Sequence, residues 1–322
     1  MSGPAARPPA ALATGLALGL TALLAAMLSL FAWPAATAAP KDVPIVVAGP
    51  AQAVGPVSGA LSQALPGAFQ VSAVSDRAQA ESAVRDQRAY GAIVVGPTGA
   101  DVLVTSARSP VVAQLLTQVG AKLGAAQQVA VTTTDVVPLP PSDPRGAGLV
   151  AGLLPIVLGG LACAAAGTML LRQRIWRVVT AGIFAVVGGF ILAALLQGWL
   201  GSLTGSLLAN AGVLTLGIAA VSFSVLGLET LLGARGLGLG AALVMLFGNA
   251  LSAASSAPEL LPTGWGALGQ LLPPGAVNSA LRSVAFFDGA GAARPLLVLA
   301  IWALVGLVLT LVPGRADKAH AA

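Results

Sequence analysis

Charge is what this chain has least of. Of its 322 residues only 8% are Asp, Glu, Lys or Arg, and 57% are hydrophobic. Soluble domains usually carry about 25% charged residues, so this composition excludes an ordinary soluble protein. The net charge of +5 comes from scattered arginines, with no basic run and no interleaved aromatic residues. That pattern excludes nucleic acid as a partner.

Residues that carry catalytic and metal chemistry are also scarce. The chain has one cysteine, Cys163, and one histidine, His320. A His/Cys metal cluster needs several such ligands, and a Ser-His-Asp triad needs a histidine beside its nucleophile. The sequence also contains no G-x-x-x-x-G-K-[ST] P-loop. We therefore expect no enzyme activity, no cofactor and no metal site, and we interpret Cys163 as a small apolar side chain within a helix.

What the chain does have is six long apolar runs. Each is close to the roughly 20 residues that a helix needs to cross a hydrocarbon core of about 30 Å. They are Ala10–Trp33, Leu149–Leu171, Val178–Leu200, Leu207–Leu228, Leu237–Ala254 and Pro295–Val312. We expect an all-α bundle of six transmembrane helices with an inserted extracellular α/β domain. A cleaved signal peptide is the alternative for the first run, since Ala36-Thr37-Ala38 resembles a cleavage site, but the length of the run favours an uncleaved span.

The short loops predict the orientation, because Lys and Arg gather in cytoplasmic loops. One side holds Arg7, Arg172, Arg174, Arg177, Arg235, Arg315 and Lys318, and the short loops on the other side hold Arg282 and Arg294. We expect a plasma-membrane protein with both termini in the cytoplasm. The predicted segments are a cytoplasmic N-terminus (1–9), the first span (10–33), the extracellular α/β domain (36–146), spans two to five (147–254), an extracellular interfacial or re-entrant segment (255–294), the sixth span (295–313) and a cytoplasmic tail (314–322).

The segment between the first two spans alternates strand and helix patterns. Strands are expected at 43–48, 69–74, 91–95, 102–105 and 129–137, and helices at 54–65, 77–88 and 109–128. Asp76 and Ser109 are expected to cap helices, with Pro110 in the first helical position. Glu81 and Arg85, four residues apart, suit a surface ion pair. No catalytic constellation is visible in this domain.

Polar groups inside the apolar runs are few, and a charge at the bilayer centre costs about 2.5–3.5 kcal/mol. Glu229 lies near the end of the fourth run, six residues before Arg235, and Asn249 lies in the fifth. One interpretation of Glu229 is an interfacial carboxylate paired with Arg235. The other is a gating or proton site, with Asn249 as a further polar group.

Residues 255–294 are apolar but broken by proline and glycine. The marked positions are Pro258, Glu259, Trp265, Pro273, Pro274 and Gly275. Non-helical backbone is tolerated at membrane depth only where protein or water satisfies it. We expect short re-entrant or interfacial helices, with Trp265 at the headgroup level and an amphipathic helix at Asn278–Phe287 lying on the bundle.

Two stretches carry a resemblance to a known family. They are Arg77–Val95, a helix running into a Tyr-Gly-Ala strand, and Gly248–Gly289, with Trp265-Gly266, Leu271–Ala276 and Phe286–Gly289. Together with the order of spans, they resemble the type-2 permeases of ATP-binding-cassette exporters, and most of all the phage-infection-protein-like and related actinobacterial membrane proteins. The scarcity of lysine (Lys41, Lys122, Lys318) beside abundant Ala, Gly, Leu and Arg is typical of such GC-rich bacteria.

The resemblance implies a homodimer that exports a lipid, polymer or drug-like substrate with a separate cytoplasmic ATPase. The natural docking loop is Arg172–Arg177, which contains Arg172, Arg174, Trp176 and Arg177. The short segment before the first span departs from the exporter pattern, which places an amphipathic helix there. The alternative is a non-transporting envelope protein whose extracellular domain binds a partner or a cell-wall polymer.

Overall fold

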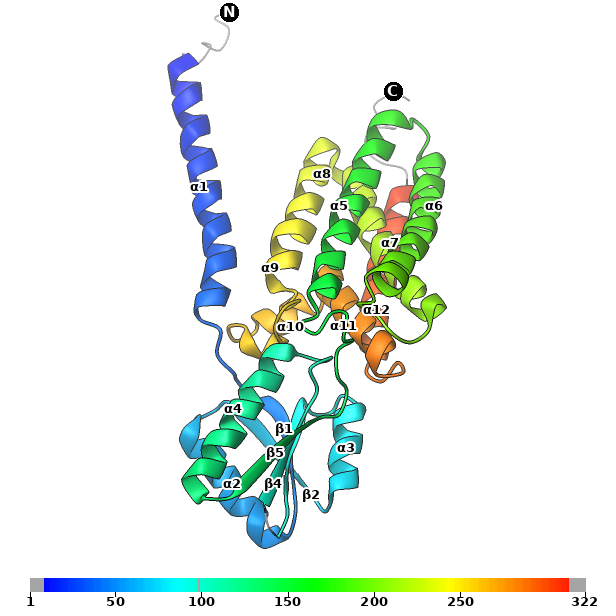
Figure 1. The fold of residues 1–322 in the computed structure, drawn as a ribbon. Helices are drawn as coiled ribbons and strands as arrows, with labels where there is room; N and C mark the ends of the chain where they lie inside the picture. The colour runs from blue at the N-terminus through cyan, green and yellow to red at the C-terminus, as the bar shows by residue number, and fades with distance from the viewer. Residues whose placement is uncertain (1–8, 98, 313–322) are drawn as a thin grey trace, which may run out of the picture.

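The computed structural model describes residues 9–97 and 99–312, and Figure 1 shows their arrangement. Six of its helices are long and apolar enough to cross a membrane, as the sequence predicts for a multi-pass membrane protein. A small α/β domain lies at one end of these helices. The start of α1 (Pro9–Ala36) and the end of α12 (Ala293–Leu311) lie at the opposite end. The predicted cytoplasmic residues Arg7, Arg315 and Lys318 lie outside the described residues.

The spans match the predicted runs with shifted ends. After α1 they are α5 (Ala147–Leu170), α6 (Arg174–Ala193) continued by the π-helical η1 (Ala194–Trp199), and α7 (Leu207–Leu232). The fifth consists of α8 (Ala234–Ala241), the π-helical η2 (Ala242–Gly248) and α9 (Asn249–Leu251), and α12 is the sixth. Because α6 already begins at Arg174, the predicted loop Arg172–Arg177 is largely helical.

Helix α7 is the centre of the bundle, with two thirds of its most apolar window buried. It packs against α5, α6, α11 (Pro273–Phe286) and α12. Where α7 packs on α12, a Cβ on Gly227 would lie 2.8 Å from the carbonyl oxygen of Gly306. Small residues permit such contact in a medium that offers no hydrophobic drive for helix association.

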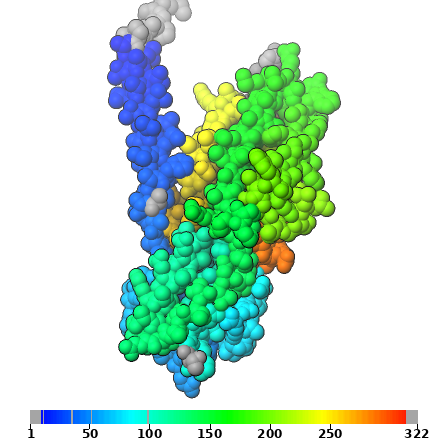
Figure 2. Space-filling model, viewed as in Figure 1, coloured from blue at the N-terminus to red at the C-terminus, as the bar shows by residue number. Residues whose placement is uncertain are grey.

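Helix α1 stands apart from the other spans. None of its most apolar window is buried, and Figure 2 shows it as a separate column over most of its length. It contacts η2 and α9 at the end near the α/β domain. There the rings of Trp33 and Trp265 meet edge to face, with centroids 4.9 Å apart. Most of the apolar surface of α1 is therefore not covered by other parts of the same copy of the protein.

The α/β domain holds a five-stranded sheet in the order β2-β1-β3-β4-β5. The strands are β1 (Val43–Ala48), β2 (Phe69–Val74), β3 (Gly91–Val95), β4 (Gly99–Val104) and β5 (Ala130–Asp135). All neighbouring pairs are parallel except β3–β4. Helices α2 (Ala51–Ala64) and α4 (Pro110–Gln127) cover one face, and α3 (Arg77–Arg85) covers part of the other.

Local capping matches the sequence expectation in this domain. The Asp76 carboxylate accepts from the amide of Gln79 at 2.9 Å, and the Ser109 hydroxyl accepts from the amide of Val112 at 3.3 Å. The predicted Glu81–Arg85 pair is wrong, because Arg77 donates to Glu81 at 2.7 Å instead. Arg77 lies one turn earlier on α3 and also reaches the sheet.

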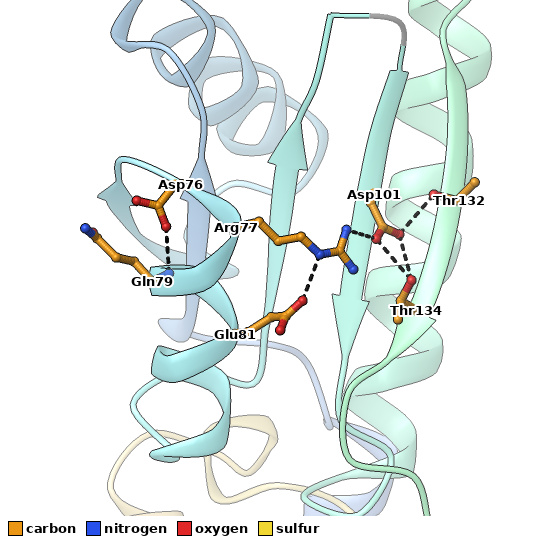
Figure 3. A network of polar contacts seen from close by, with 7 residues as sticks. All are labelled: Asp76, Arg77, Gln79, Glu81, Asp101, Thr132 and Thr134. Carbon is orange, nitrogen blue, oxygen red and sulfur yellow. Dashed lines mark hydrogen bonds and ion pairs between the residues drawn. The ribbon is translucent and has the colours of Figure 1, made fainter.

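The sheet face beside α3 carries a polar network around Asp101 (Figure 3). Arg77 donates to Asp101 at 2.6 Å, and the hydroxyls of Thr132 and Thr134 donate to the same carboxylate at 3.0–3.1 Å. Burial by itself raises the pKa of Asp101, but these hydrogen bonds outweigh it and hold the pKa below its ordinary value. The network joins α3 to β4 and to the edge strand β5.

Residues 252–292 form a layer between the bundle and the α/β domain (Figure 1). Its helices are η3 (Pro258–Leu260), α10 (Trp265–Gly269) and α11. The expected helix begins earlier, at Pro273, and lies on the bundle as predicted, but the α/β domain also covers it. It is buried on nearly all sides, because α7 and α12 cover one side and the α/β domain contacts another.

Candidate functional sites at the two ends of the bundle

The junction between the α/β domain and the bundle is organised by Arg282 on α11, which is only 5% exposed. Its guanidinium donates to the carbonyls of Ala107 at 2.7 Å and Ala254 at 3.0 Å, and to the Asn278 side-chain oxygen at 3.2 Å. Ala107 belongs to the domain, and Ala254 follows the fifth span. Burial lowers the pKa of Arg282 to about 10, so the group stays charged at neutral pH. The Arg282 guanidinium thus connects α11, the α/β domain and the segment after the fifth span through hydrogen bonds.

A second set of contacts joins the domain to η3. The Tyr90 hydroxyl donates to the Glu259 carboxylate at 2.7 Å, and the Arg108 guanidinium lies 3.8 Å from the centre of the Tyr90 ring. Burial raises the pKa of Tyr90, so the phenol remains a donor. Gln87 donates to the hydroxyl of Ser283 on α11 at 3.0 Å. Buried polar groups that are satisfied in this way fix one arrangement of the two parts.

The connector between α1 and β1 is attached to the same layer. The amides of Ala39 and Lys41 donate to the carbonyls of Leu260 and Glu259, and the Lys41 ammonium donates to the Thr263 hydroxyl at 3.0 Å. The return connector is fixed as well, because the Asp143 carboxylate accepts from the first amides of α5 at 2.8 Å. Movement of the domain is therefore coupled to both spans that flank it.

These contacts surround a cavity of about 250 Å³, here called the junction cavity. It is lined by side chains of the domain and of the layer: Gln87, Tyr90, Arg108, Glu259, Gln270, Asn278, Ser279, Arg282, Ser283 and Arg294 among others. A second hollow of about 380 Å³ shares Pro258, Glu259, Gln270 and Arg294 with it and opens beside Lys41. The lining is polar and carries charges of both signs.

The residues that the sequence marks in the broken segment 255–294 have two kinds of place in the structure: some line the cavities, and others make packing contacts. Pro258 and Glu259 line both cavities. Trp265 packs on Trp33, and its place at the headgroup level stays a prediction. Pro274 packs closely on Gly248 of the fifth span, and a side chain on Gly275 would overlap the Gly269 carbonyl. These last contacts are structural and hold the layer against the bundle.

At the other end of the bundle lies a basic hollow of about 520 Å³. It is lined by Arg172, Arg174, Arg177, Glu229, Thr230, Leu231, Leu232, Gly233, Arg235 and Leu239. The sequence predicted two separate features here, a docking loop and a gating pair, and the structure brings their charged residues together. Trp176 is not part of the lining and is 56% exposed beside it. Asn249 lies far along the fifth span, at the start of α9.

The partner of Glu229 differs from the one predicted. Arg177 on α6 donates to Glu229 on α7 at 3.0 Å, with both side chains about 13–14% exposed. Arg177 is placed there because α6 begins at Arg174, which puts it on the first turn of that helix, facing α7. The pair therefore joins two spans, whereas the predicted Arg235 lies on the next helix and is exposed.

Sequence reasoning missed most of the junction. Tyr90, Arg108 and Arg282 were not singled out as functional, since each is a lone polar residue in an unremarkable context. A buried arginine in an otherwise apolar helix was the one available clue, because charged side chains are rarely buried without partners. Their partners are backbone carbonyls and residues about 170 positions away, which a single sequence does not reveal.

Comparison with family models finds no match for this chain, and neither do comparisons with curated proteins or with solved structures. Among residues 9–97 and 99–312, no group of three His, Cys, Asp or Glu side chains is placed to hold a metal ion.

Proposed function

We propose that this chain is a permease-like membrane subunit of an ATP-binding-cassette-type exporter, which moves a lipid, polymer or drug-like substrate out of the cell. The observation that carries the proposal is the fastening of the α/β domain to the broken apolar layer through Arg282, Tyr90–Glu259 and Gln87–Ser283. A domain that is merely anchored needs only its connectors. Here a shift of the domain is transmitted directly to α11 and to the ends of the spans.

The substrate path in this proposal runs between two copies. The interior around α7 is packed with apolar side chains such as Leu214, Ile218 and Leu299, which leaves little room for a polar path through one copy. The most apolar window of helix α1, by contrast, has no buried residue. A second copy facing α1 and the fifth span would enclose a path that ends at the junction layer.

The ATPase in this proposal binds the end of the bundle that carries the basic hollow. The α5–α6 connection is only three residues long; Arg172 within it and Trp176 just after it are exposed. A short, rigid connection transmits force better than a long loop. The proposal requires this end to face the cytoplasm and the α/β domain to face outward.

The test is affinity purification of the tagged full-length protein from its native host in mild detergent, with mass spectrometry of the proteins retained. The proposal predicts a P-loop ATPase in stoichiometric amount, which is lost when Trp176→Ala and Arg172→Glu are combined. Lys122→Glu, on an exposed position of α4, is the control and should retain it. Recovery of the chain without any nucleotide-binding protein would count against the proposal.

The alternative is an envelope protein whose α/β domain binds a partner or a wall polymer. It is favoured by the outer strand β5, which pairs only with β4 and is exposed along most of its length. An edge strand of this kind can accept another strand from a partner. In the same purification, envelope proteins retained through residues 41–140 would support this reading.

A further inference from the structure

The basic hollow has a surplus of positive charge at one point of a weakly charged protein. Among the described residues that line it, four arginines face a single carboxylate, so the formal charge is 4 − 1 = +3. Glu229 neutralises Arg177, and Arg174 donates to the carbonyl of Val312 at 2.8 Å. Arg172 and Arg235 are exposed, and neither makes a hydrogen bond or ion pair with the described part of the chain. An anion between them would relieve the repulsion.

The two exposed arginines approach the hollow from different elements. Arg172 lies in the connection between α5 and α6, and Arg235 lies in the first turn of α8, after the sharp bend at Gly233. Guanidinium groups from two sides suit a phosphate, because each presents paired donors to its oxygens. The start of α6 adds backbone amides without a capping side chain, which favours negative charge at the same place.

The position of the hollow indicates where the phosphate comes from. It lies where α6 begins and α7 ends. Both helices are long and apolar enough to cross a bilayer, so we expect these ends at the depth of the headgroups. Leu232 and Leu239 in its lining are 47% and 57% exposed, and they adjoin the apolar surfaces of the spans. Trp176 beside it is an aromatic residue of the kind that gathers at this depth. A ligand that fits both surfaces carries a phosphate and acyl chains.

We propose that the basic hollow binds the headgroup of an anionic phospholipid, with Arg172 and Arg235 on the phosphate and Leu232 and Leu239 against the acyl chains. The bound lipid bridges the α5–α6 connection and α8; α6 and α8 both pack on α5 and α7. The proposal does not depend on transport or on an ATPase, and it concerns the purified chain in lipid alone.

The test is native mass spectrometry of the purified full-length protein in micelles with added phosphatidylglycerol or phosphatidylcholine of equal chain length. We expect the parent protein to bind phosphatidylglycerol in preference to phosphatidylcholine. Arg235→Gln should weaken phosphatidylglycerol binding about fivefold, and Arg172→Gln combined with Arg235→Gln should weaken it about thirtyfold. The reason is that each arginine near the membrane surface contributes a comparable share of the binding free energy. Both side chains are exposed, so folding should be unchanged, which thermal unfolding of each variant checks.

Arg145→Gln is the matched control, because Arg145 is exposed at the other end of the same bundle and carries the same charge. It should leave the preference for phosphatidylglycerol intact. Equal binding of the two lipids, or an unchanged preference in the double variant, would overturn the proposal. Displacement of phosphatidylglycerol by millimolar inorganic phosphate would overturn it as well, because the site would then recognise a free anion.

Discussion

At the scale of single residues, Arg282 determines how the α/β domain sits on the spans. Its hydrogen bonds to Ala107 and Ala254 use backbone carbonyls, which accept from any residue type, so the contact depends on the guanidinium alone. The charge is buried without a carboxylate in contact, and Asn278 supplies the remaining acceptor. Such a group is costly to remove, since its partners would be left without donors in a buried place.

We therefore expect Arg282→Met to loosen the junction by about 2–4 kcal/mol, because two buried carbonyls lose their donor. Hydrogen exchange of the full-length protein in detergent should become faster around residues 105–109 and 252–256. Arg282→Lys should be intermediate, since one ammonium cannot reach both carbonyls equally well. Arg294→Gln, an exposed arginine on the same cavity, is the control. Unchanged exchange in Arg282→Met would contradict the role given to this residue.

Asp101 gives a pH-dependent prediction. Its pKa in the folded protein lies below the unfolded value of about 3.9. Its contribution to stability is therefore complete above that value and is lost as the pH falls through the folded-state pKa. At pH 7, Asp101→Asn should weaken the β4–β5 pairing by about 1–2 kcal/mol through its charged hydrogen bonds.

The measurement is amide exchange of β4 and β5 in parent and variant, compared at each pH. The two should differ at pH 7 and converge once the pH has fallen below the folded-state pKa of Asp101, where the parent carboxylate is protonated. Asp86→Asn should have almost no effect at any pH, because the Asp86–Arg88 pair is largely exposed. A difference between Asp101→Asn and its parent that persists below that pH would show that charge is not the cause.

At the scale of secondary-structure elements, the sequence predicts strands better than it predicts helix environments. Strands β1, β2 and β3 begin and end at the predicted residues, because short β-rich runs are bounded there by Pro, Gly and polar residues. Helix α11 packs on the bundle as predicted, but its second cover, by the α/β domain, was not predicted. A helix buried between two parts of a protein can have a sequence much like that of a helix lying on one of them. No sequence pattern predicts the π-helical stretches η1 and η2 either.

Side-chain partners were harder still to predict. The sequence suggested Arg85 for Glu81 and Arg235 for Glu229, since both are near neighbours along the chain. The structure gives Arg77 and Arg177. Arg177 is 52 residues from Glu229, and only the packing of α6 on α7 brings them together.

The packing of α7 on α12 is tested at Gly306. A Cβ there would overlap the backbone of Phe223 and Ser224, which cannot give way without separating the helices. We expect Gly306→Ala to destabilise the protein by about 1–3 kcal/mol, the usual effect of overpacking. Thermal unfolding in detergent measures it. Gly182→Ala on α6 is the control, because nothing lies within 4 Å of its Cβ, and it should be neutral or slightly stabilising. Equal effects of the two changes would contradict the close approach.

At the scale of the whole molecule, the chain has two ends with different chemistry. One carries the α/β domain and a mixed-charge junction cavity, and the other carries the basic hollow. The α/β domain lies at one end of the six apolar helices, and the start of α1 and the end of α12 lie at the other end (Figure 1). The proposed exporter function requires one orientation of this molecule, with the basic end in the cytoplasm where an ATPase can reach it.

Cysteine labelling in intact cells tests this orientation most directly. In a Cys163→Ala background, Lys122→Cys marks the α/β domain and Arg172→Cys marks the α5–α6 connection, and both positions are exposed. A membrane-impermeant maleimide should label the first in intact cells and the second only after lysis. Labelling of Arg172→Cys in intact cells, with protection of Lys122→Cys, would contradict the proposed function, because the basic end would then face away from any cytoplasmic ATPase.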